Sequence, residues 1–251
     1  MNWTQILWDA IEDEDVEIVR QAIENGADIH ATDDEFSSDW CALYKAVGSS
    51  NKVAANEMCE IFLQAGANPN RRSAEGNTPL YWAVVGGDEN LVRRLIKYGA
   101  KVTEEQPKPD DGEFSLHHAA EVGQLEIVKL LLEVGGRNVL NQFNYISRTP
   151  LMCAAENNHF DIAQLLIKAG SDVNAFNEPN IGNTVLRQIA QTGSYEMIKL
   201  LVDAGADPTI PGWMQITALD QARERVENSK KPSAEAVEIL KLLEGVATRL
   251  S

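Results

Sequence analysis

Apolar residues along the chain recur with the spacing of short helices, and residues 149–175 show this pattern most clearly. Thr149-Pro150 is typical of a helix start, because threonine can cap free amide groups and proline at the first helical position gives up a donor that had no partner. The pattern predicts a first helix through Leu151–Ala155 and a second over about Phe160–Lys168, which Gly170 ends in a left-handed conformation. Neither helix is long enough to be stable alone, so the pair needs similar units on both sides.

The same pattern recurs along the chain. Glycines that would end a second helix lie at Gly26, Gly66, Gly99, Gly135, Gly170 and Gly205. The helix-opening signal lies at Thr78-Pro79-Leu80, Phe114-Ser115-Leu116, Thr149-Pro150-Leu151, Thr184-Val185-Leu186 and Thr217-Ala218-Leu219, with degenerate versions at Gln5-Ile6-Leu7 and Cys41-Ala42-Leu43. From Thr78 onward, successive starts are 36, 35, 35 and 33 residues apart.

This unit resembles the ankyrin repeat, whose period is about 33 residues and whose first helix opens with Thr-Pro-Leu-His. The resemblance implies an all-α ankyrin-repeat solenoid of helix-turn-helix units joined by short β-hairpin loops. We expect a single domain over residues 1–251. Its repeats would lie at about 1–35, 36–73, 74–109, 110–144, 145–179, 180–212 and 213–251. The charged last helix is expected to close the stack and complete the chain.

Some repeats depart from the pattern. Residues 41–66 are four longer than the equivalent stretches, which predicts a longer loop between the helices over residues 48–55. Residues 104–113 predict an acidic finger stiffened by proline, and an insertion over residues 224–234 would separate the last two helices. In the first repeat, we expect one apolar face to point inward, made of Ile6, Leu7, Ala10, Ile18, Val19, Ala22 and Ile23.

Charge limits the classes of partner. The net charge is −16, and residues 1–35 hold eleven acids against Arg20 alone. This balance argues against binding to phosphate backbones or to anionic membranes, because both need clustered lysine and arginine. The acidic end is either a solvated capping repeat or a surface that steers a basic partner.

The cysteines and the N-terminus indicate a compartment. Cys41, Cys59 and Cys153 are an odd set without metal-ligand spacing, which predicts small buried thiols in a reducing environment. The sequence has no basic start of a secretory signal and no apolar run that could span a bilayer. We therefore expect a cytoplasmic protein.

Catalytic and metal-binding signals are weak. We find no nucleophile–base arrangement, phosphate loop or metal spacing, so we expect no enzyme activity and no cofactor or metal. Adjacent His117 and His118 point in different directions on a helix and are poorly placed to chelate one ion. The resemblance implies that His117 makes structural hydrogen bonds across repeats, while His118 could face a partner. Residues 33–35 and 110–111 lack the glycine and distal glutamate of a calcium loop.

A binding surface therefore remains. By resemblance, partners lie on the concave face, which is made of hairpin tips and the inner faces of first helices. The predicted partner-binding residues are Trp40, Glu113, Glu121, Tyr145, Ile146, Arg148, Phe176, Ile181, Trp213 and Met214. Loops prefer small polar residues, so some of these apolar side chains must pack on neighbouring hairpins and others would contact a partner.

We interpret the chain as a non-catalytic protein-binding module for a basic protein, as an inhibitor or immunity-type protein that is monomeric when free. One alternative is an adaptor that tethers two proteins without inhibiting either. Another is a nucleic-acid mimic, which would need evenly spaced exposed acids. An enzyme would need a deep polar pocket around His118 or paired carboxylates.

Overall fold

A computed structural model describes residues 1–31, 41–73, 76–102, 114–177 and 182–250, and in these ranges the regular structure is helical, with no β-strand. The α-helices of the N-terminal half are α1 (Trp3–Glu12), α2 (Val16–Glu24), α3 (Ala42–Val47), α4 (Lys52–Gln64), α5 (Pro79–Val85), α6 (Glu89–Lys97), α7 (Ser115–Val122) and α8 (Leu125–Glu133). Those of the C-terminal half are α9 (Pro150–Glu156), α10 (Phe160–Ala169), α11 (Val185–Ile189), α12 (Tyr195–Asp203), α13 (Ala218–Glu227) and α14 (Ala234–Leu250). Short 3₁₀ turns, η3 (Gly136–Val139) and η4 (Trp213–Gln215), lie in the loops.

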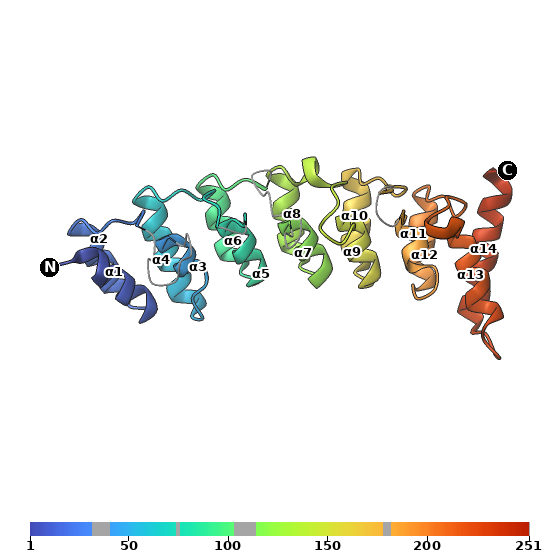
Figure 1. Cartoon of the computed structure of the whole chain (residues 1–251), viewed down its shortest axis with the longest axis horizontal. Helices are drawn as coiled ribbons and strands as arrows, with labels where there is room; N and C mark the ends of the chain where they lie inside the picture. The colour runs from blue at the N-terminus through green and yellow to red at the C-terminus, as the bar shows by residue number, and fades with distance from the viewer. Residues whose placement is uncertain (32–40, 74–75, 103–113, 178–181, 251) are drawn as a thin grey trace. The chain divides into compact units, whose positions relative to one another are not determined.

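The helices form pairs within two compact units (Figure 1). The first unit comprises Met1–Ser115 and Lys129–Gly136, and in it α1 packs on α2, α3 on α4 and α5 on α6. The second comprises Leu116–Val128 and Arg137–Ser251, with the pairs α9–α10, α11–α12 and α13–α14. Within each unit, helices also contact their counterparts in the neighbouring pair, as α4 does α6 and α11 does α13. The all-α repeat fold expected from the sequence is thereby confirmed. None of the helices in the described ranges combines the length and apolar character needed to span a bilayer.

Helix boundaries follow the expected local chemistry. Thr149 Oγ1 accepts a hydrogen bond from the Met152 amide at 3.3 Å, and Thr78, Thr184 and Thr217 cap their helices in the same way. All six of the repeated glycines have positive φ angles, between 86° and 116°. A side chain at such φ values is strained, so glycine is the residue that ends these helices at low cost.

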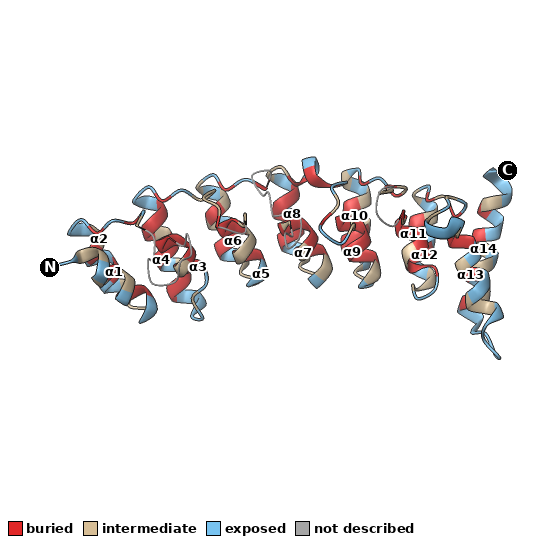
Figure 2. Ribbon diagram, viewed as in Figure 1, coloured by how far each residue is buried: buried red, intermediate tan, exposed pale blue. Residues whose placement is uncertain are grey.

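The core of each unit lies between adjacent helices, where Figure 2 shows most of the buried residues. The motif leucines Leu80, Leu116, Leu151 and Leu186 are all 0% exposed. Burying one such side chain is worth about 1.5–3 kcal/mol. Since a single short pair has one such face to bury, stability depends on contact with the next pair.

Asparagine side chains link successive loops within each unit. Asn174 Nδ2 donates to the Gly205 carbonyl at 3.0 Å, and its Oδ1 accepts from the Asp207 amide at 2.9 Å. Asn70 makes the same two bonds to Gly99 and Lys101, at 2.9 and 2.8 Å. One amide group thus satisfies both a donor and an acceptor of the following repeat and fixes the register between repeats.

The expectation of a longer loop over residues 48–55 was wrong. The additional residues extend the second helix, because α4 has 13 residues where α6 has 9. Asn51 caps α4 by accepting from the amides of Val53 and Ala54, and the following alanines favour the helix. The loop that remains is fixed by Glu14, whose carboxylate accepts from Ser49, Ser50 and Asn51.

The ends of the chain also differ from expectation. Ile18 is 39% exposed, whereas Ile11 is 2% exposed and belongs to the core. Ile18 precedes the buried Val19 by one residue, so it lies about 100° around α2, on a side that the described part of this repeat leaves uncovered.

At the C-terminal end, the expected insertion is partly helical: α13 continues to Glu227, and residues 228–233 connect it to α14. The acidic finger over residues 104–113 lies outside the described residues.

Candidate functional site

Two hairpin tips of the second unit display large apolar side chains. Residues 144–148 and 212–216 form tight hairpins. Asn144 N donates to Arg148 O (2.9 Å) and Ser147 N to Asn144 O (2.9 Å) in the first, and Gly212 N donates to Ile216 O (3.0 Å) and Gln215 N to Gly212 O (3.0 Å) in the second. The exposed fractions of the apolar tip residues are 50% for Tyr145, 40% for Ile146, 63% for Trp213 and 68% for Met214. We call these four residues the apolar tips. The sequence predicted all four as partner contacts, and their exposure keeps them accessible.

The backbone at these tips is unusual. Ser147, Met214 and Gln215 have φ angles of 61°, 58° and 62°, in the left-handed region that favours glycine. Two consecutive left-handed residues are typical of a hairpin turn that normally uses Asn-Gly. Placing methionine and glutamine there costs about 1–3 kcal/mol each. Such strain is often found where a loop presents side chains for a function.

A small polar hollow of about 140 Å³ lies beside the first tip. Arg148 forms an ion pair with Glu156 of α9 at 2.6 Å, and Asn177 Nδ2 donates to Ser147 Oγ at 3.3 Å. The described residues that line the hollow are Ile146, Ser147, Arg148, Glu156, Asn177, Gly182, Asn183 and Gln188. The hollow has room for one polar side chain of a partner and offers it amide groups and an ion pair.

Other predicted contact residues are placed differently. Phe176 is half-buried, and its ring packs so closely on Gly182 that a Cβ there would lie 2.9 Å from the ring. Glu121 is also half-buried, and its backbone carbonyl accepts from His159 Nε2 at 2.9 Å. Trp40, Glu113 and Ile181 lie outside the described residues. Of the apolar loop side chains, Phe176 is therefore one that packs within its own loop, between α10 and α11.

The buried residue directly after the motif leucine anchors the next hairpin in three repeats. His117 Nε2 donates to the Gln142 carbonyl at 2.9 Å, which confirms the structural role expected for this histidine. Tyr44 occupies the same position in the second repeat. Its hydroxyl accepts from the Ser73 amide at 2.9 Å, and its one proton can be donated to the carbonyl of Arg71 (3.0 Å) or of Asn77. In the sixth repeat, this position is held by Arg187, which the sequence reasoning missed. Arg187 follows Leu186 as His117 follows Leu116, and this equivalent position could have indicated its anchoring role.

Neither a metal site nor a reactive thiol appears in the described ranges. No group of three His, Cys, Asp or Glu side chains there could hold a metal ion. Cys41, Cys59 and Cys153 are free and buried, as the sequence predicted, and burial raises the pKa of the Cys59 thiol. A thiol with a raised pKa is a poor nucleophile at neutral pH. His118 is half-buried.

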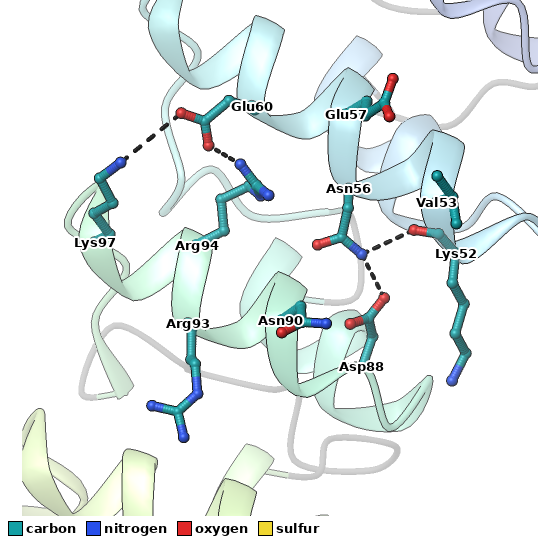
Figure 3. Close-up of a pocket in the computed structure, with 10 residues that line it drawn as sticks. All are labelled: Lys52, Val53, Asn56, Glu57, Glu60, Asp88, Asn90, Arg93, Arg94 and Lys97. Carbon is teal, nitrogen blue, oxygen red and sulfur yellow. Dashed lines mark hydrogen bonds and ion pairs between the residues drawn. The ribbon is translucent and has the colours of Figure 1, made fainter.

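An open groove of about 600 Å³ lies in the first unit, between α4 and α6 (Figure 3). Several of its polar residues bond with one another. Arg94 and Lys97 both point toward Glu60, and Asn56 donates to Asp88 at 2.7 Å.

Glu60 also accepts from the Tyr98 hydroxyl at 2.6 Å. This hydrogen bond, followed by the bond and charge of Arg94, outweighs desolvation and lowers the pKa of Glu60 from 4.5 to about 2. We interpret this network as a contact that joins α4 to α6, because its strongest acid is already satisfied within the unit.

Comparison with known proteins agrees with this geometry. A family model described as ankyrin repeats (3 copies) matches residues 7–106 and 116–212. The human ASB11 ankyrin repeat domain superposes with a TM-score of 0.71 at 24% identity, over 95% of this chain and 97% of that domain. The ankyrin repeat domain of Bcl-3 gives 0.73 at 24% identity, over 94% and 97%. At this identity, both structures show the fold alone.

Curated relatives match over shorter segments. The Drosophila melanogaster transient receptor potential cation channel subfamily A member 1 is 32% identical over 123 residues, 45% of this chain and 10% of that channel. The human 2-5A-dependent ribonuclease is 31% identical over 86 residues, 34% of this chain and 11% of that protein. A putative ankyrin repeat-containing protein of Treponema pallidum is 32% identical over 97 residues, 39% of this chain and 30% of that protein. The matched segments thus span about a tenth to a third of these relatives.

Proposed function

Because the chain belongs to the ankyrin repeat family, whose repeats are protein–protein interaction modules, we propose that it binds a basic protein through the apolar tips of its second unit. Trp213 and Met214 would serve as the main anchors, and Tyr145 and Ile146 would add contacts from another hairpin of the same unit. Arg148 and Glu156 would supply polar contacts at the small hollow.

The single observation that carries this proposal is the exposure of the apolar tips. Trp213 and Met214 are both more than 60% exposed, although their backbone is held in a strained turn. Water-exposed aromatic and methionine side chains contribute nothing to the core of the chain. Residues of these types are the usual anchors of protein interfaces, where their burial supplies binding energy.

The basic character of the partner follows from charge. The chain carries a net charge of −16, and exposed acids of the first repeat include Asp9, Glu12, Asp13, Glu17 and Glu24. A field of this sign accelerates encounters with positively charged proteins and repels acidic ones. The acids would therefore govern the association rate, while the apolar tips would govern the dissociation rate.

The biological role that fits best is that of an inhibitor or immunity-type protein, monomeric when free, which covers a basic enzyme. Three buried free thiols favour a reducing compartment such as the cytoplasm. Measuring the turnover of the bound partner separates an inhibitor from an adaptor, since an adaptor leaves turnover unchanged.

The test is affinity capture with the full chain and two variants. In the Trp213→Ala/Met214→Ala variant, the two most exposed tips are truncated. The control is Val53→Ser, because Val53 is 68% exposed on α4 in the other unit. We expect the wild type and the control to retain one basic protein. The amount of this protein captured should fall at least tenfold with the tip variant. Its association rate should decrease as the salt concentration increases. Retention of an acidic protein, or equal retention by the tip variant, would refute the proposal.

A further inference from the structure

Arg187 differs in chemistry from the other residues that anchor hairpins. It is 6% exposed, and in the described part of the chain no carboxylate lies within ion-pairing distance of its guanidinium. Its Nη2 donates to the Trp213 carbonyl at 3.4 Å, and its Nη1 bonds Asn183 Oδ1. Burial lowers the pKa of Arg187, although an arginine stays protonated at neutral pH. A buried charge is costly unless it is hydrogen-bonded, so its bonds to these two oxygens hold the guanidinium in place.

The space around Arg187 shows what the guanidinium touches. A Cβ placed on Gly212 would lie 2.8 Å from both Nε and Nη1 of Arg187, and 2.3 Å from the Gly182 carbonyl oxygen. The guanidinium therefore packs directly against the backbone of Gly212, where the hairpin begins. Its two terminal nitrogens reach the hairpin and the preceding loop together.

The hairpin that Arg187 contacts is closed by its own backbone hydrogen bonds, from Gly212 N to Ile216 O and from Gln215 N to Gly212 O, but its side chains give it little support. It contains the left-handed Met214 and Gln215, and η4 has no buried residue. Its side chains therefore do not hold it in place, and the strain at the two left-handed positions favours its relaxation. The contacts of Arg187 with Gly212 and the Trp213 carbonyl oppose that relaxation.

We propose that Arg187 is a positioning residue that holds the 212–216 hairpin in its strained turn and so keeps Trp213 and Met214 presented to the partner. The biological purpose of this positioning rests on the proposed function, but the positioning itself can be measured without a partner. The fork of the guanidinium is the required feature, because it bridges two loops with one rigid group. A lysine would keep the charge and lose the bridge.

The experiment uses the full chain labelled with 5-fluorotryptophan, with ¹⁹F NMR of the Trp213 signal and amide hydrogen exchange of Gln215. The Trp213 signal is assigned by its loss in Trp213→Phe. The variants are Arg187→Met and Arg187→Lys, and the matched control is His117→Met, at the same motif position two repeats earlier. Far-UV circular dichroism checks that each variant is folded.

We expect Arg187→Met to shift the Trp213 signal toward that of the free amino acid and to accelerate Gln215 exchange at least tenfold. Arg187→Lys should lie between wild type and Arg187→Met, and it keeps the test informative if Arg187→Met does not fold. His117→Met should leave both readouts unchanged. Unchanged readouts in a folded Arg187 variant, or equal changes in the control, would overturn the inference. Failure of the tip variant to lose its partner would refute the proposed function alone.

Discussion

Replacing Glu60 by glutamine should destabilise the first unit at neutral pH and have little effect in acid. The Glu60 carboxylate accepts from Tyr98 at 2.6 Å and from Gln64 at 3.0 Å, and it pairs with Arg94. A carboxyl pKa lowered from 4.5 to about 2 corresponds to about 3 kcal/mol of preference for the charged form. Because the Glu60 side chain is 21% exposed, solvent screening reduces the expected contribution to about 1–2 kcal/mol.

The sign of the pH dependence follows from the lowered pKa. The folded state binds the Glu60 proton less tightly than the unfolded state, so the stabilisation is present above pH 4.5 and is lost as the pH falls toward about 2. Urea unfolding of the wild type and Glu60→Gln at pH 7 and pH 2.5 measures this difference. The control is Glu89→Gln, which removes a surface ion pair with Arg93 (2.7 Å) whose acid is 42% exposed, and should cost no more than about 0.5 kcal/mol. A Glu60→Gln cost that is equal at both pH values, or no larger than that of the control at pH 7, would refute this reasoning.

Three further outcomes follow from the packing. Asn174→Ala removes two hydrogen bonds between loops and should lower the free energy of unfolding by about 1–2 kcal/mol, measured in urea, whereas an unchanged midpoint would contradict the role given to this amide. Gly212→Ala should lower the melting temperature, because its Cβ would lie 2.3 Å from the Gly182 carbonyl oxygen, whereas the exposed Gly245→Ala should not. The three buried thiols should react with Ellman's reagent only after denaturation, so rapid labelling of the native chain would contradict their burial.

The sequence predicted the repeated elements well because their causes are local. The threonine caps and the six left-handed glycines act within one turn of helix, so a single chain segment specifies them. The motif leucines are buried for the same reason, since each occupies a fixed place on a short amphipathic helix. At residues 48–55 the length of the repeat did not distinguish two structures, because the four extra residues fit either a longer loop or a longer α4.

The candidate site could be predicted only in part. The apolar composition of the hairpins identified Tyr145, Ile146, Trp213 and Met214, but it also selected Phe176, which packs on Gly182. Whether an apolar loop residue is exposed depends on how the loop folds on itself, as Phe176 does on Gly182, and on the next loop about 30 residues away, as between Asn177 and Ser147. Arg187 was missed for the related reason that its described partners, Asn183 Oδ1 and the Trp213 carbonyl, lie in the preceding and following loops and carry no charge.

Hydrogen exchange of the complex tests the central claim most directly. With the captured partner bound, we predict slower amide exchange in residues 144–148 and 212–216. Amide exchange in α4 and α6 should be unchanged. Protection confined to α4 and α6, with the two hairpin tips exchanging as in the free chain, would contradict the account.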